Sequence, residues 1–236
     1  MDGATDRRSW WVLAGLVLST ALAGCAVTQR AKVGGENYCP FLGNDVCGML
    51  TATTDKKEAD LRYVNPSARW SQYTKVLIEP VTFWGGDQSK LSPADQRTLT
   101  NFFYQTLTQQ LAKKFQVVDQ AGPGVMTIQV ALEDATAATP GLRSISLVEP
   151  HARALATLKY LATGTFPFVG SAQAETKITD SVSGQLLAAA VSKRVGGGSP
   201  KDAAQWEWGD AENAITYWAQ LMTTRLASWT SGTAAS

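Results

Sequence analysis

The sequence has few of the residues from which catalytic and metal sites are usually built. It contains one histidine, His151, and three cysteines in 236 residues. Any zinc site or catalytic triad that needs an imidazole would have to use His151. This histidine lies alone after Pro150, a position more typical of a solvated or capping residue than of a catalyst. Sites with several histidines are excluded.

Charge is also scarce, and its two signs are balanced. Charged residues make up 17% of the chain, below the roughly 25% of a typical soluble domain. The 21 basic and 20 acidic residues give a formal net charge of +1. Nucleic-acid-binding domains normally carry a basic excess, so we expect no nucleic-acid partner. Hydrophobic residues make up 44%, enough for a folded core.

The motifs that could support catalysis are incomplete. Ser171 lacks the flanking glycines of a nucleophile elbow. In Gly196–Lys201, Pro200 precedes the lysine and no Ser or Thr follows it, so a phosphate-binding loop is not favoured. Glu133 and Asp134 are neighbours on a predicted strand and should point to opposite faces, which argues against a paired-carboxylate glycosidase. We expect no enzyme, no cofactor and no metal site.

The first 25 residues have the three-part layout of a secretory signal. Arg7 and Arg8 precede an apolar run at 10–18, which is too short for a transmembrane span. Leu22–Cys25 resembles the bacterial lipobox. The resemblance implies that residues 1–24 are a lipoprotein signal peptide and that Cys25 becomes the acylated N-terminus. The alternative is an ordinary signal peptide with a chance cysteine.

Acylation at Cys25 would make membrane lipid a permanent partner of the chain, because two or more acyl chains hold a protein stably in a bilayer. Ala26 follows the cysteine, where an aspartate would direct retention in the inner membrane. By resemblance to the sorting rule of Gram-negative lipoproteins, this implies the outer membrane, with the folded body facing the periplasm.

Cys39 and Cys47 are the other two cysteines. The periplasm is oxidising, and the residues between them include Pro40, Gly43 and Asn44, which favour a chain reversal. A disulfide is therefore the favoured interpretation, two free thiols are the main alternative, and a metal site is the least supported.

The chain is predicted to divide into a tether and one domain. Residues 26–37 are polar and contain glycine, and residues 51–60 lack an apolar period, so residues 25–60 are expected to form the lipidated N-terminus and a flexible tether. A single domain is predicted over residues 61–230.

The apolar periodicity within this domain predicts both strands and helices. Ser92, Pro93 and Asp95 form a helix start, and Asp210 is expected to cap a last helix. The expected helices are 92–115, a short one at 155–164, and 210–229; the expected strands are 74–79, 116–119, 126–132, 168–180 and 186–195, the last two joined as a hairpin. The segment at 135–149 has no clear pattern. This order predicts an α+β fold, a mostly antiparallel sheet with two long helices packed on one face.

Eight distinct motifs lie along the predicted domain: Tyr63–Pro66, Tyr73–Trp84, Leu91–Gln96, Phe115–Asp119, Ala162–Thr165, Phe168–Ala172, Gly184–Val191 and Trp208–Asp210. In these motifs the chain resembles, over about residues 37–229, a family of bacterial lipoproteins known as domain of unknown function 3313. The resemblance implies a lipid-anchored envelope protein and carries over no catalytic residue. The element order also resembles the layer sandwich of periplasmic lipoproteins that bind other envelope proteins.

Tryptophans are the remaining candidates for a binding site. Trp84, Trp206 and Trp208 lie in predicted loops, where aromatic side chains can bind partners or stack on sugars; alternatively they close the end of the core. Trp218 and Trp229 fit the core face of the last helix. We therefore predict a non-enzymatic outer-membrane lipoprotein that binds another envelope protein. A small-ligand or glycan-binding lipoprotein is the first alternative, and an enzyme built on an unfamiliar carboxylate site is the second; buried carboxyl groups that converge and have shifted pKa values would favour the enzyme.

Overall fold

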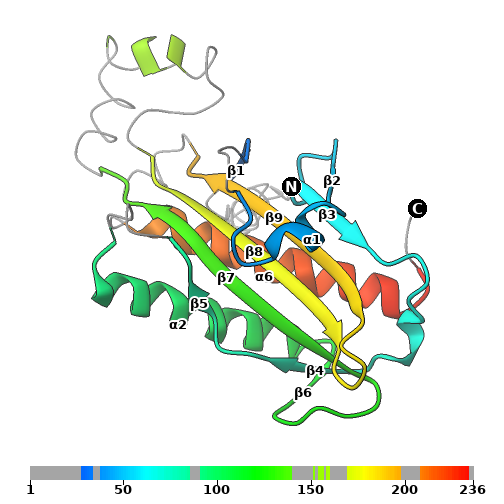
Figure 1. The fold of residues 1–236 in the computed structure, drawn as a ribbon. Coiled ribbons are helices and arrows are strands. Elements are labelled where there is room, and N and C mark those ends of the chain that lie inside the picture. Colours follow the sequence, from blue (N-terminus) through cyan, green and yellow to red (C-terminus); the bar gives the residue numbers. More distant parts are fainter. Residues whose placement is uncertain are drawn as a thin grey trace, which may run out of the picture.

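The computed structural model describes residues 28–33, 38–85, 91–139, 151, 154–156, 158–159, 169–197 and 208–233. Its strands are β1 (Gln29–Ala31), β2 (Thr51–Ala52), β3 (Leu61–Val64), β4 (Lys75–Ile78), β5 (Thr82–Phe83), β6 (Gln116–Val118), β7 (Val125–Thr136), β8 (Ser171–Asp180) and β9 (Leu186–Val195). Its helices are α1 (Gly43–Cys47), the 3₁₀ turn η1 (Trp70–Gln72), α2 (Pro93–Leu111) and α6 (Gly209–Thr230). The strands form one sheet in the order β2-β3-β9-β8-β7-β4-β6, with β1 beside β9 and β5 beside β7 (Figure 1).

The two long helices lie together on one face of the sheet, as predicted. At the start of α2, the Ser92 hydroxyl accepts a hydrogen bond from the Asp95 N–H (3.1 Å) and Pro93 occupies the first turn. Leu99, Phe103 and other buried residues of α2 face the core, and the Phe103 ring stacks on Trp218 of α6 with centroids 5.9 Å apart. This pairing confirms the amphipathic pattern of both helices.

The expectation of a mostly antiparallel sheet is wrong, because the sheet is mixed. Strand β4 pairs in parallel with both β6 and β7, and β5 pairs in parallel with β7. The reason is the position of α2 in the chain: it crosses over after β4 and β5, so the next strands run in the same direction as β4. The predicted hairpin of β8 and β9 is confirmed, and those two strands pair antiparallel throughout.

Much of the expected tether is part of the domain. Strand β1 pairs antiparallel with β9, and α1 follows the segment that packs on the sheet. Cys39 and Leu42 form an apolar cluster with Ala189 and Val191 of β9, whereas Ala188 belongs to the helix-side core. Since side chains alternate along a strand, this N-terminal layer covers the sheet face opposite α2 and α6 (Figure 1). The flexible-tether prediction is thus wrong for residues 28–33 and 38–60, because this face needs an apolar cover.

The start of α6 joins two of the motifs singled out in the sequence. Asp210 is buried, and its carboxylate accepts a hydrogen bond from the Gly170 N–H at 2.7 Å. A Cβ at Gly170 would lie 2.6 Å from the Thr136 carbonyl oxygen, and one at Gly196 would overlap the Asp210 carboxyl group. Asp210 is not the helix cap that was predicted, since Trp208 occupies that position. It instead ties α6 to the ends of β8 and β9.

Replacing Asp210 with alanine is expected to destabilise the domain by about 2–4 kcal/mol. The substitution leaves the buried Gly170 N–H without its acceptor and removes a carboxylate from the positive end of a helix. Urea unfolding followed by circular dichroism measures the effect. Asp119→Ala, on an exposed aspartate, is the control and should change stability by less than about 0.5 kcal/mol; equal losses in the two variants would contradict the assigned role of Asp210.

Candidate functional site

The structure separates the residues that the sequence proposes for binding. Cys25 and Trp206 lie outside the described residues. Cys39 and Cys47 are joined as a disulfide across α1, with Cα atoms 6.3 Å apart. Trp84 is 46% exposed, whereas Trp208 is 6% exposed and belongs to the core. The proposed binding role of Trp208 is therefore wrong: its place at the N-terminus of α6 turns the indole into the core.

Trp84 is exposed but firmly held. Its backbone N–H donates to the Leu132 carbonyl oxygen (2.8 Å), and its indole N–H donates to the Thr82 hydroxyl (3.0 Å). Its ring meets Phe41 edge to face, with centroids 5.6 Å apart. Gly85 allows the chain to pass close to β7, because a Cβ there would lie 2.5 Å from the Glu133 carbonyl oxygen. A rigid, exposed indole beside the disulfide loop is suited to contact with a partner.

A buried pair of carboxyl groups lies beneath the same loop. Glu175 is fully buried and accepts hydrogen bonds from the Phe41 N–H (3.0 Å) and the Leu42 N–H (2.7 Å). The carboxyl group of Glu133 accepts from the Gln173 side-chain amide at 2.5 Å. Burial, followed by the hydrogen bond to Glu175 and its negative charge, raises the pKa of Glu133 to about 9. Glu133 therefore keeps its proton at neutral pH.

Sequence reasoning missed this pair because its members come from two strands. It considered Glu133 only with Asp134, and the β7–β8 register shift between Leu132 and Asp134 places Glu133 in a bulge. A usable signal was present, since Gln173 and Glu175 are two residues apart and so share one face of β8. Both carboxyl groups are closed off from solvent, an arrangement suited to holding the disulfide loop on the sheet.

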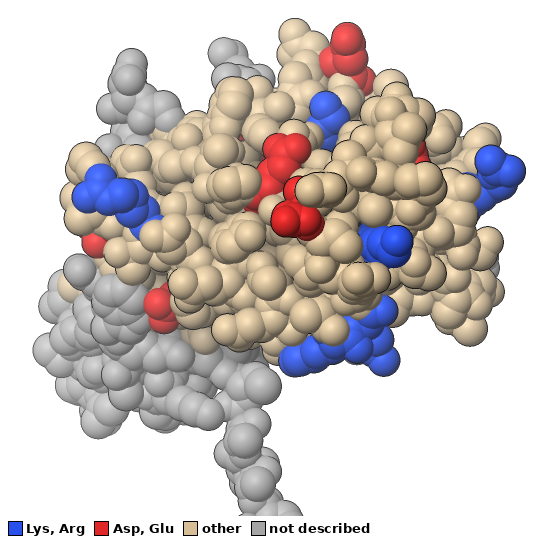
Figure 2. Space-filling view, turned by 90° about the horizontal axis from the view of Figure 1, so that it is seen from below, with Lys and Arg blue, Asp and Glu red and all other residues tan. Residues whose placement is uncertain are grey.

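The other candidates from the sequence have ordinary structural positions. The Ser171 hydroxyl shares a 2.7 Å hydrogen bond with the Thr136 hydroxyl, and His151 is exposed. Of Gly196–Lys201, only the first two residues are described. Within the described ranges, no three His, Cys, Asp or Glu side chains are grouped as a metal site would require. The face shown in Figure 2 carries its Lys and Arg side chains as separate groups rather than as one basic surface.

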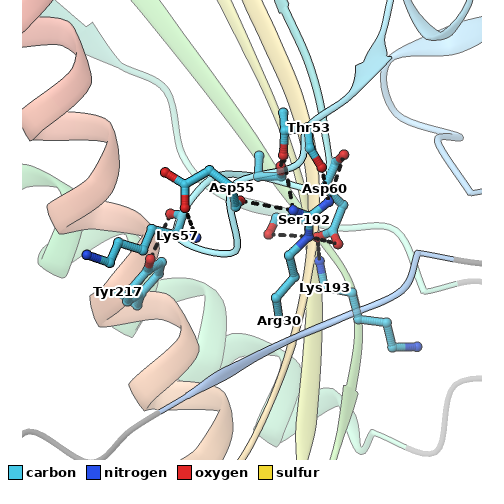
Figure 3. Close-up of polar contacts among 9 residues, drawn as sticks. Arg30, Thr53, Asp55, Lys57, Asp60, Ser192, Lys193 and Tyr217 are labelled. Carbon is cyan, nitrogen blue, oxygen red and sulfur yellow. Dashed lines mark hydrogen bonds and ion pairs between the residues drawn. The ribbon is translucent and has the colours of Figure 1, made fainter. Parts of the chain in front are cut away.

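A polar network fixes the loop at residues 53–60 between β1, β9 and α6 (Figure 3). Arg30 forms an ion pair with Asp60 (2.7 Å) and donates to the Thr53 hydroxyl (3.1 Å). Asp60 also accepts from the Ser192 hydroxyl (3.2 Å), and Tyr217 of α6 donates from its hydroxyl to the Lys57 carbonyl oxygen (2.7 Å). The loop is therefore tied to three elements that are distant in the sequence.

Two hollows flank this loop. One is an apolar cavity of about 90 Å³ under α6, where Trp218 and Trp229 contribute to the lining. The other is a larger groove of about 930 Å³, which we name the anchor-side groove; its lining residues are Thr28–Val33, Ala52–Thr54, Lys56, Lys57, Asp60, Leu61, Arg194 and Tyr217. Neither hollow is lined by Trp84 or Trp208, so the expected tryptophan-lined ligand pocket is not formed by these two residues.

Comparison with known proteins identifies a family but no activity. The family model described as "Protein of unknown function (DUF3313)" matches residues 41–222. Among curated proteins, none matches this chain. Within the described residues, no helix has the length and apolar character needed to cross a membrane.

Several solved structures are distantly similar. PelC of Paraburkholderia phytofirmans, solved as a dodecamer, has 10% identity and a TM-score of 0.38, with 69% of this chain and 94% of PelC covered. A Xanthomonas campestris protein of the family DUF330 has 10% identity and a TM-score of 0.39, with 72% and 93% covered. A candidate lipoprotein of Caulobacter crescentus has 12% identity and a TM-score of 0.35, with 71% and 96% covered.

Proposed function

We propose that this chain, which belongs to the DUF3313 family of proteins of unknown function, is an outer-membrane lipoprotein of the periplasm. Acylated Cys25 would hold it in the membrane, and its α+β domain would bind another envelope protein without catalysing a reaction.

One observation carries the proposal: the fold begins almost at the lipobox cysteine. Thr28 is only three residues after Cys25, and it is already buried, accepting hydrogen bonds from Arg194 at 2.6 and 3.0 Å. Three extended residues span at most about 11 Å. An acylated Cys25 would therefore hold the domain directly on the bilayer, with β1 and the 53–57 loop nearest the lipid.

The surface around Trp84 is the proposed contact with the partner. It combines the exposed indole, the Phe41 ring and the disulfide loop of the N-terminal layer, which lies on the sheet face opposite α2 and α6. Tryptophan at such a position often dominates the free energy of binding. A non-catalytic role is supported by the closed position of Glu133 and Glu175 beneath this loop.

In-cell crosslinking tests the partner surface. A photo-crosslinking residue at position 84 is expected to capture one envelope protein, identified by mass spectrometry. The same residue at position 182 is the control, because Val182 is also exposed (67%) but lies in the β8–β9 turn. The partner proposal would be abandoned if position 84 captured no envelope protein above background, or if both positions captured the same proteins equally.

A further inference from the structure

The anchor-side groove has a charge unlike that of the whole chain. Five of its lining residues are basic, Arg30, Lys32, Lys56, Lys57 and Arg194, and one is acidic, Asp60. Asp60 is already paired with Arg30. The lining residues therefore carry a formal excess of four positive charges, five basic minus one acidic, although the chain has a formal net charge of only +1. This local excess indicates a preference for an anion.

Arg194 supplies the second observation. It is only 4% exposed, its guanidinium lies 3.7 Å from the centre of the Tyr217 ring, and its Nε and Nη2 donate to Thr28. Its Nη1 is buried and has no hydrogen-bond partner among the described residues. Burying a guanidinium with an unused donor costs free energy, which an oxygen acceptor at Nη1 would offset, and a negatively charged oxygen would offset it most.

We propose that the anchor-side groove binds a phosphate group, with Arg194 as the buried contact and Lys32, Lys56 and Lys57 as exposed contacts. Arginine and lysine are the side chains that proteins use most for phosphate. The phosphate source that fits a groove near the bilayer is the headgroup of an anionic phospholipid. This choice of source rests on the proposed membrane anchor, which would hold the groove beside the bilayer surface. The groove would then orient the domain on the membrane that Cys25 attaches it to.

The test uses the full chain without its signal peptide and with Cys25→Ser, so that no acyl group contributes to binding. We expect this protein to sediment with vesicles containing phosphatidylglycerol and not with phosphatidylcholine vesicles, and to dissociate as salt is raised. The double variant Lys56→Gln/Lys57→Gln should bind the anionic vesicles about ten- to thirtyfold more weakly. Lys113→Gln/Lys114→Gln removes the same charge from exposed positions after α2 and should bind normally.

Two further measurements separate a built site from general attraction. Arg194→Lys keeps the charge but removes the unpaired donor, and it should weaken binding while retaining the circular dichroism spectrum of the parent chain. Inorganic phosphate should raise the melting temperature of the parent chain more than that of Arg194→Lys. Stabilisation by inorganic phosphate without any preference for anionic vesicles would support the phosphate site and overturn the lipid source.

Equal weakening by the two lysine double variants, or no response to either phosphate or anionic vesicles, would overturn the proposal. Because the Cys25→Ser protein used in these tests carries no acyl groups, their outcomes are independent of whether Cys25 is lipidated in the cell.

Discussion

Replacing Cys25 with alanine is expected to move the protein completely from the membrane fraction to the soluble fraction. Acyl chains stabilise membrane insertion by about 0.8 kcal/mol for each buried methylene, and the described residues contain no helix that could replace them as an anchor. Cell fractionation with a high-salt wash measures the loss, and the salt removes attraction between the basic groove and lipid. The mature wild-type chain should begin at an acylated Cys25 by intact mass.

Ala26→Asp is the matched variant for this experiment. It leaves the acylated cysteine in place, so the protein should stay in the membrane fraction. In the sorting rule of Gram-negative lipoproteins, an aspartate after the acylated cysteine directs retention in the inner membrane. The Ala26→Asp protein should therefore move from the outer to the inner membrane. Retention of Cys25→Ala in the membrane after the salt wash would contradict the anchor, and an unchanged location of Ala26→Asp would contradict the outer-membrane assignment.

Local signals in the sequence predict the two long helices and the hairpin well, but not the short α1 and η1. Most of the expected helix at 155–164 lies outside the described residues. The capping of α2 by Ser92 and the apolar spacing of α6 depend on residues within one helix, and the β8–β9 turn depends on a few neighbouring residues. In that turn the Asp180 carboxylate accepts hydrogen bonds from the Val182 and Ser183 N–H groups, at 3.1 and 2.7 Å. Such interactions are encoded within a few positions, so the pattern alone identifies them.

Features that depend on pairing between distant segments were not predicted. The direction of β6 and β7 follows from the route of the chain past α2, which no local pattern encodes. The sequence predicts a tether in place of the N-terminal layer because β1 has three residues and β2 has two, too few to show an apolar period. Trp208 lies in an apparent loop and is buried by α6, so its burial is a tertiary effect.

The pair of Glu133 and Glu175 was also not predictable from local sequence patterns. Its expected effect on the pH dependence of stability is the second large one. Glu133 and Glu175 are 42 residues apart in the sequence, and only the β7–β8 pairing brings them together. Because burial and Glu175 raise the pKa of Glu133 to about 9 from its ordinary value of 4.5, the folded protein keeps a proton that the unfolded chain releases between these values. The free energy of unfolding should therefore fall as pH rises from about 5 to 9, by up to about 1.4 kcal/mol for each pH unit.

Glu133→Gln should remove this dependence. A glutamine amide has no proton to lose, can accept from Gln173 through its oxygen, and can donate to Glu175 through its nitrogen. The variant should match the wild type near pH 5 and be more stable by about 2–4 kcal/mol at pH 8, as measured by urea unfolding at both values. Glu79→Gln is the control. Glu79 also accepts a hydrogen bond from a glutamine side chain (Gln129, 2.8 Å), but it is only part-buried. Its partner is an amide rather than a second carboxyl group.

The two variants together locate the proton. If the pH dependence persisted in Glu133→Gln, another group would carry it, and the loop would be held by the Glu175 hydrogen bonds alone. If it disappeared, Glu133 would be the group that titrates, and its neutral form would be what lets Glu175 accept from the Phe41 and Leu42 N–H groups beside a second carboxyl group. The position of Phe41, whose ring contacts Trp84 edge to face, would then depend on Glu133 remaining protonated at neutral pH.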